Sequence, residues 1–267
     1  MIVASALSLD VVLAAVAAVA YGVSAAGAHG LQPRWARVAF WSAWLLHGIV
    51  LALALIGDDR RFGFAPALSM TAWLVGAVYL VESLVYPSLH TRWAMAALGA
   101  VATLMGAIMP GQPLHNTASA WLPLHWMLGL ASYGLFGMAV VHAWFMTRAE
   151  ARIRLASDAQ AGLPLLTLER LTFRFVTVGF LLLSATMLAG IFFGGQLYGA
   201  AGALRLTHKT AFALLSWLTF ATLLWGRQHF GWRGKRAVRV LYLGAALLLL
   251  AYVGSRFVLE VVLQRPA

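Results

Sequence analysis

The sequence predicts an all-α protein, a polytopic transmembrane helix bundle of about eight spans. Of its 267 residues, 62% are hydrophobic and 10% are charged, whereas a soluble domain is about half apolar and about a quarter charged. The mean hydropathy is +0.84. The apolar runs have the length of about 20 residues that a helix needs to cross the hydrocarbon core. They lack the alternating polarity of a porin strand, so the spans are expected to be helical.

The spans follow one another with short connections. The first apolar run has no basic residue before Arg34 and is too long for a signal peptide, so we interpret it as a span. Pro110, Gly111 and Pro113 predict a turn between the fourth and fifth spans. The longest polar piece is about 147–173, and its residues 167–173 predict a helix start that continues into span six. No second domain is indicated, so residues 1–267 form a single one. The expected spans are 3–27, 38–56, 65–85, 93–109, 121–146, 174–194, 208–226 and 238–262.

Basic residues predict the orientation in the membrane. The chain has 19 Lys and Arg against 8 Asp and Glu, a net charge of +11. Thirteen of these 19 lie near the connections after the first, third, fifth and seventh spans. Because cytoplasmic loops carry an excess of Lys and Arg, both termini are expected outside. We therefore expect a multi-pass protein of the bacterial inner membrane, with the lipid bilayer as partner and no nucleic acid.

The residue types exclude several chemistries. The chain has no cysteine, which excludes zinc fingers, iron–sulfur clusters and thiol nucleophiles. It also has no Walker loop, dinucleotide-binding fingerprint or zinc-protease helix motif. We therefore do not expect an enzyme.

Histidines are the main candidates for function, because ionisable residues are costly within a membrane span. Four fall near the expected cytoplasmic side and are interpreted as solvated or at the level of the lipid headgroups: His29, His90, His142 and His229. The predicted orientation places the other four in the outer half of the bundle: His47, His115, His125 and His208.

Haem is the favoured ligand of these outer histidines. Imidazole binds haem iron as well as copper, zinc and nickel ions, but no carboxylate lies beside these histidines in the sequence. Aromatic residues such as Trp121 surround them, and the cations Lys209 and Arg256 lie at the expected level to pair with propionates. Two other classes stay open: a small-molecule or metal-ion transporter whose histidines line a path, and a non-catalytic partner subunit whose histidines bond neighbouring helices.

Several short motifs resemble one known family. Residues 121–126 read Trp-Leu-Pro-Leu-His-Trp and precede a Ser132-Tyr133 pair; residues 213–218, 231–237 and 252–254 supply further matches. In this order the motifs resemble the cytochrome c assembly family, the CcsA/CcmC-like haem handlers. The fit is best to its short YpjD/HemX-like inner-membrane branch, through Leu-His-Gly in span two and His-Lys-Thr opening span seven. The resemblance covers about 40–262.

This resemblance implies a haem-binding protein. His125 falls on the family's first external haem ligand, and His208 lies where the haem loop runs into the next span. The chain departs from the full-length pattern, because residues 194–207 contain no tryptophan and no histidine follows Tyr252. Trp225 stands where full-length members have a membrane histidine. The implied role is haem handling in cytochrome c assembly, with non-covalent b-type haem, His125 and His208 or His47 as axial ligands, and other biogenesis membrane proteins as partners.

Overall fold

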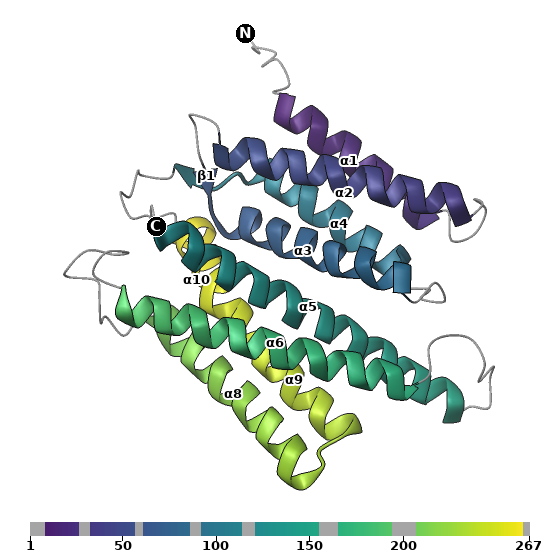
Figure 1. Cartoon of the computed structure of the whole chain (residues 1–267). Helices are drawn as coiled ribbons and strands as arrows, with labels where there is room; N and C mark the ends of the chain where they lie inside the picture. Colours follow the sequence, from purple (N-terminus) through teal and green to yellow (C-terminus); the bar gives the residue numbers. More distant parts are fainter. Residues whose placement is uncertain are drawn as a thin grey trace. The chain divides into compact units, whose positions relative to one another are not determined.

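A computed structural model describes residues 9–26, 33–56, 61–85, 92–113, 121–154, 165–193 and 207–263 (Figure 1). Within these ranges the chain is almost entirely helical. Its contacts divide it into two compact units. The first comprises Met1–His115 together with Arg256–Ala267, and the second comprises Asn116–Ser255.

The first unit contains the helices α1 (Leu9–Ala26), α2 (Pro33–Ile56), α3 (Phe64–Val85) and α4 (Arg92–Ile108). Helix α1 packs against both α2 and α4, and α3 packs against α4. Small residues allow the close approach: a Cβ on Gly99 of α4 would lie 2.6 Å from the ring of Tyr21 on α1. Such small-residue contacts are how membrane helices pack without a hydrophobic driving force between them.

A two-stranded antiparallel ladder joins the segments that follow α2 and α4. Strand β1 (Arg61–Phe62) pairs with β2 (Gln112–Pro113). Gly111 turns the chain into β2 with φ of 83°, and a Cβ there would lie 2.6 Å from the carbonyl of Phe62. Only glycine fits this position. The turn between α4 and α5 is confirmed, but the all-α prediction did not include the ladder.

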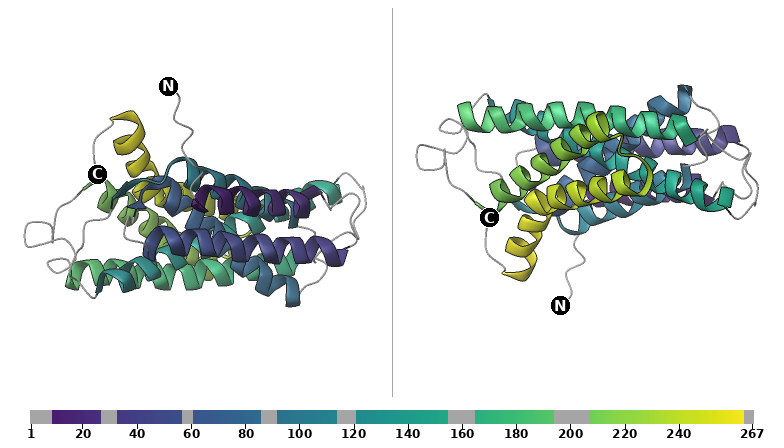
Figure 2. Two further views of the ribbon diagram at one scale, coloured as in Figure 1. Left: turned by 90° about the horizontal axis from the view of Figure 1, so that it is seen from above. Right: turned by 90° about the horizontal axis from the view of Figure 1, so that it is seen from below.

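The second unit contains α5 (Trp121–Arg154), α6 (Leu165–Phe192), α8 (His208–Phe230) and α9 (Gly234–Leu249). Its core stacks Phe136 of α5 on Phe220 of α8, with ring centroids 3.8 Å apart. Gly244 of α9 makes room for Phe220, because a Cβ there would lie 2.9 Å from that ring. Helices α8 and α9 form a hairpin, seen in yellow-green and yellow (Figure 2).

The eighth expected span is not one regular α-helix. After α9 come the π-helical turns η1 (Leu250–Gly254) and η2 (Val258–Val262), separated by α10 (Ser255–Phe257). Just before η1, the hydroxyl of Tyr133 donates to the carbonyl oxygen of Leu248 at 2.5 Å. The wider π-helical register breaks the regular α-helical bonding, which hydropathy alone does not reveal. In the first unit, the ring of Phe257 lies 5.3 Å from that of Phe64.

Each expected span corresponds to a helix, but not each is long and apolar enough to cross a membrane. Among the described residues, six helices meet that condition by length and composition: α1, α2, α3, α5, α6, and α9 with its continuation to Phe257. Helix α4 has only 17 residues, and α8 begins with His208 and Lys209 and carries Arg227 and His229 in its last turn. The number of about eight crossings and the outside termini stay predictions.

The polar connection between α5 and α6 is shorter than the expected 147–173. Helix α5 continues to Arg154, and α6 begins at Leu165. The predicted helix start at 167–173 is confirmed, since those residues lie in the first turns of α6. Polar residues on the ends of both helices explain why hydropathy placed the boundaries too close to the apolar cores.

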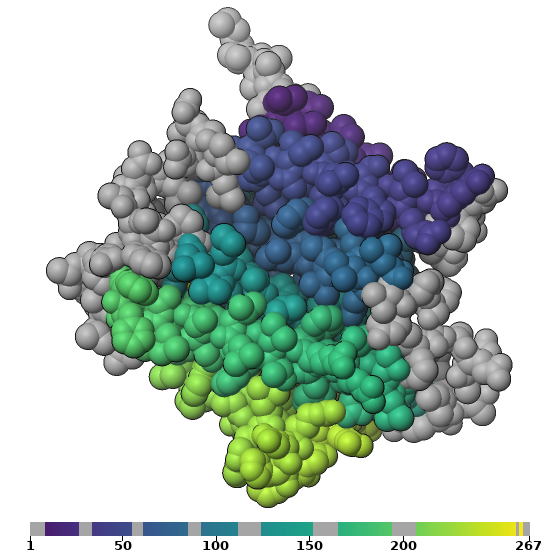
Figure 3. All heavy atoms as spheres, in the orientation of Figure 1, coloured from purple at the N-terminus to yellow at the C-terminus, as the bar shows by residue number. Residues whose placement is uncertain are grey.

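Large apolar side chains cover the outward faces, as expected for helices that meet lipid. On α6, Leu181 is 61% exposed, Ile191 62% and Phe192 75%. Figure 3 shows α6 in green as a continuous part of the surface on the face drawn there. A soluble monomer seldom exposes such contiguous apolar area, so these faces support a membrane protein.

Candidate functional site

His125 lies one turn into α5 and packs against α6. Its side chain is half-buried, and it is hydrogen-bonded to the backbone of Thr186. A Cβ on Gly190 would lie 3.7 Å from its Cε1 atom, so Gly190 leaves room beside the imidazole. Trp121 begins α5, but its side chain lies outside those that the structure describes.

His208 and Lys209 lie in the first turn of α8. Thr207 is the N-cap, and its side-chain oxygen accepts from the backbone N–H of Thr210 at 3.4 Å. The side chain of His208 is exposed. The Lys209 Nζ lies 5.4 Å from the ring centroid of Tyr252, close enough for a cation–π interaction.

The starts of α5 and α8 lie at the same end of the second unit. Helices α5 and α6 are antiparallel, because His125 is opposite Gly190 and Phe136 is opposite Gly179. Helices α6 and α8 are also antiparallel: Trp217 donates to Ser184 at 2.8 Å, whereas Arg227 near the end of α8 pairs with Glu169 near the start of α6. His125 and His208 therefore both lie at the end of the unit where α6 finishes.

Aromatic side chains fill the interior of the second unit between these helices. The rings of Phe180 and Trp217 stack with centroids 5.3 Å apart. The indole N–H of Trp217 and the hydroxyl of Tyr133 both have hydrogen-bond partners within the unit. The interior between these helices is therefore apolar, and these two polar groups within it are hydrogen-bonded.

His47 lies in the first unit and is fully buried on α2. Its Nδ1 atom lies 3.4 Å from the Tyr21 hydroxyl, and its Nε2 atom lies 2.8 Å from the Ser69 hydroxyl. It thus links α1, α2 and α3. An axial ligand must offer a ring nitrogen to iron, and in this arrangement each nitrogen faces a hydroxyl. Arg256 also belongs to the first unit.

His142 was expected to be solvated or at the level of the lipid headgroups, and the expectation of a solvated side chain is wrong. Its side chain is completely buried, and its ring centroid lies 5.4 Å from that of Phe175 on α6. The reason is that α5 continues past it to Arg154. The signal in the sequence was its small neighbours: Ala139 and Ala143 mark the same inward face and are also fully buried.

Of the four remaining histidines, the structure describes one. His229 is exposed, as expected, and its ring centroid lies 5.1 Å from that of Trp225. His29, His90 and His115 lie outside the described residues. Within the part of the chain that the structure describes, no three His, Asp or Glu side chains are grouped to hold a metal ion. Haem iron takes at most two protein ligands, so this finding concerns bare ions only.

A chain with six apolar helices of membrane-crossing length is a helical membrane protein. The family model described as cytochrome C assembly protein matches residues 35–263. The chain therefore belongs to the cytochrome c assembly protein family.

Three relatives illustrate the range of the family. The inner membrane protein YpjD of Escherichia coli K12 is 28% identical over 265 residues, covering 94% of this chain and 99% of the relative. The cytochrome c biogenesis protein CcsA of Prochlorococcus marinus subsp. pastoris is 23% identical over 227 residues, covering 80% and 68%. An uncharacterised 28.8 kDa protein of Azospirillum brasilense is 27% identical over 239 residues, covering 84% and 86%. No solved structure matches the chain significantly.

Proposed function

We propose that the protein binds haem through His125 and His208 in the second unit and handles haem during cytochrome c assembly. The observation that carries this proposal is that two helices start at one end of the same unit, each with a histidine in its first turns. The family and the printed names of its relatives, inner membrane protein and cytochrome c biogenesis protein, support haem handling in a bacterial inner membrane.

The residues at this end of the unit fit haem. The imidazoles of His125 and His208 are the ligands that iron accepts. Lys209, beside His208, supplies a cation for a propionate, and Trp121 at the start of α5 is proposed as part of the apolar lining. Bound haem would be of the non-covalent b type, because thioether attachment needs cysteines and the chain has none. His47 is the less favoured ligand because hydroxyls already face both its nitrogens. His47 and Arg256 both belong to the first unit, so neither is part of the site proposed in the second unit.

The proposed role is to hold and pass on a cofactor rather than to catalyse a reaction. The sequence has no recognisable catalytic motif. Other membrane proteins of cytochrome c biogenesis are the proposed partners, since a carrier of haem must exchange it with donors and acceptors.

The test is an absorbance spectrum of the detergent-purified protein, oxidised and then reduced with dithionite. We expect a Soret band and sharp reduced α and β bands, which indicate a six-coordinate low-spin haem such as one with two histidine ligands. His125→Ala and His208→Ala should each shift or abolish these bands while the gel-filtration profile is unchanged. His229→Ala is the matched control, because His229 is exposed at the opposite end of α8.

The result that would overturn the proposal is a colourless protein that also fails to bind added haem. Uptake into proteoliposomes that depends on histidines would then favour the transporter. Co-purification with a fixed partner, together with silent histidine substitutions, would favour a partner subunit.

A further inference from the structure

The turn between α8 and α9 carries a concentration of charge that the haem proposal does not use. We propose that this turn, together with the apolar groove beside it on α6 and α8, binds an anionic phospholipid. The site lies at the end of the second unit opposite to His125 and His208, so it does not depend on haem binding.

The turn is rigidly built. Gly231 and Gly234 have positive φ angles of 62° and 55°. The backbone N–H of Trp232 donates to the carbonyl of Gly226 at 3.2 Å, and a Cβ on Gly226 would lie 2.5 Å from the Trp232 ring. The guanidinium of Arg236 lies 4.1 Å from the centroid of the same ring. The indole is thus held between the backbone of α8 and a cation of α9.

The charge of this cluster is strongly positive. Glu169 of α6 is the single carboxylate that contacts it among the described residues, accepting from Arg227 at 2.7 Å and lying 3.6 Å from Arg233. Arg227 also lies 3.5 Å from the centroid of the Phe173 ring, so it is fixed in place. The basic residues of the turn are Arg227, Arg233, Lys235, Arg236 and Arg239, and the last four are exposed.

Three of these cations have no protein anion in the part of the chain that the structure describes. Lys235, Arg236 and Arg239 make no ion pair there. All three side chains are exposed. Four positive charges remain after Glu169 is counted, and they lie where α8 ends and α9 begins, which is the level at which a lipid phosphate is found.

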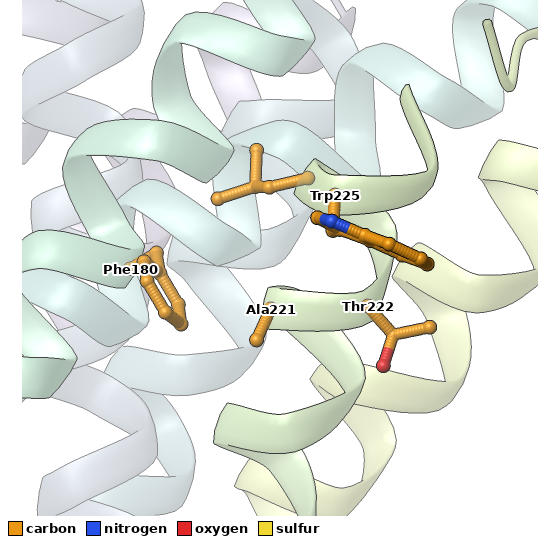
Figure 4. A pocket seen from close by; sticks show the side chains of 5 residues that line it. Phe180, Ala221, Thr222 and Trp225 are labelled. Atoms are coloured by element: carbon orange, nitrogen blue, oxygen red, sulfur yellow. The ribbon is translucent and has the colours of Figure 1, made fainter. Parts of the chain in front are cut away.

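An apolar groove lies on α8 next to this turn (Figure 4). It has a volume of about 430 Å³ and is lined by Phe180, Ala221, Thr222, Leu224 and Trp225. The hydroxyl of Thr222 donates to the carbonyl of Leu218 in its own helix, so it offers the groove no free donor. Trp225 and Phe230 are 54% and 64% exposed, as is typical of aromatic residues at a membrane interface.

The cations of the turn and the apolar groove together favour an anionic phospholipid as the ligand. The groove is formed in part by residues 221–225 of α8, the exposed Phe230 ends the helix, and the exposed cations Arg233 and Lys235 follow in the turn and at the start of α9. This is the order of acyl chain, interface and phosphate in one leaflet of a bilayer. A soluble acidic peptide or a nucleic acid would pair with the cations and leave the groove unused.

The test measures lipid retention by native mass spectrometry of the detergent-purified protein. Phosphatidylglycerol and phosphatidylcholine with the same acyl chains are titrated separately. We expect phosphatidylglycerol to bind about tenfold more tightly, and the triple variant Lys235→Gln, Arg236→Gln, Arg239→Gln to lose that preference. The matched control is Arg148→Gln, because the Arg148 guanidinium also stacks on an indole, 4.2 Å from the ring centroid of Trp144.

A second variant and a competitor separate the two parts of the site. Ala221→Phe fills the groove and keeps every charge, and it should weaken phosphatidylglycerol binding. Soluble glycerol phosphate at the same concentration should not displace the lipid. Equal retention of both lipids, an unchanged triple variant, or full displacement by glycerol phosphate would each overturn the proposal. Gel filtration of each variant verifies that it is folded.

Discussion

The two units use their polar side chains differently. In the first unit, the polar side chains around His47 and between Trp44 and Trp73 are hydrogen-bonded within the unit. His47 lies between the hydroxyls of Tyr21 and Ser69. The indole N–H groups of Trp44 and Trp73 each donate to the other residue's carbonyl at 2.9 Å, with the rings stacked 4.7 Å apart.

In the second unit the histidines of interest lie near helix starts. His125 is half-buried beside a glycine, and His208 is exposed. The comparison teaches that burial alone does not identify a ligand in a membrane protein. A buried imidazole whose two nitrogens both face hydrogen-bonding groups links neighbouring helices. An imidazole near the end of a helix can instead offer a nitrogen to another molecule. Three pairs of substitutions test how the engaged and the available side chains differ, in order of decreasing effect on stability.

The largest loss of stability is expected for His47→Leu. The change leaves the Tyr21 and Ser69 hydroxyls buried without their partner, so we expect a loss of about 2–4 kcal/mol in the free energy of unfolding. Unfolding is followed by titration with SDS. The same change at exposed His229 should cost less than about 0.5 kcal/mol. A His47→Leu protein that is folded but loses its haem bands would contradict this structural role, because His47 would then be a haem ligand.

The next largest loss of stability is expected when one of two helix glycines is replaced by alanine. Gly99→Ala places a methyl group 2.6 Å from the buried Tyr21 ring, and overpacking of this kind costs about 1–3 kcal/mol. Gly190→Ala places one at an ordinary 3.7 Å from His125. We expect the thermal unfolding midpoint to fall for Gly99→Ala and to stay unchanged for Gly190→Ala. A lower midpoint for the second variant would show that the space beside His125 is tightly packed.

The smallest effect concerns two hydroxyls on α8. Ser216 is fully buried and donates to the carbonyl of Gly244 on α9 at 2.8 Å, so Ser216→Ala should destabilise the protein by about 1 kcal/mol. Thr222 is exposed and bonds only within its own helix. Thr222→Ala should be neutral or slightly stabilising, because alanine is the better helix former. Equal SDS midpoints for the two variants would contradict the role given to Ser216.

Hydropathy predicted the positions of the helices, but not their irregular turns or which of their histidines are buried. Long apolar runs require helices in a membrane, because each backbone group must be bonded internally. The π turns after Leu249 and the ladder between Phe62 and Gln112 escaped prediction, since both depend on contacts with distant residues. The burial of His142 was missed because the end of α5 was placed too early in the chain.

The candidate ligands show the same limit of sequence reasoning. His125 and His208 were singled out from depth and motif, and the antiparallel packing of α5, α6 and α8 places them at one end of the second unit. That His47 is engaged by Tyr21 and Ser69 could not be predicted, because these partners lie 26 and 22 residues away in the sequence. Which helix faces meet is decided by packing, not by local pattern.

The path of the chain through the two units sets the order in which their sequences are completed during synthesis. Residues 116–255 form one uninterrupted stretch, whereas the first unit needs both its N-terminal helices and the residues from Arg256 onward. Synthesis proceeds from the N-terminus, so the second unit has its full sequence before the first does. The residues from Arg256 onward, made after the second unit, therefore join the unit that was begun first. A cut or a fusion near the C-terminus would act on α1 to α4 rather than on α5 to α9.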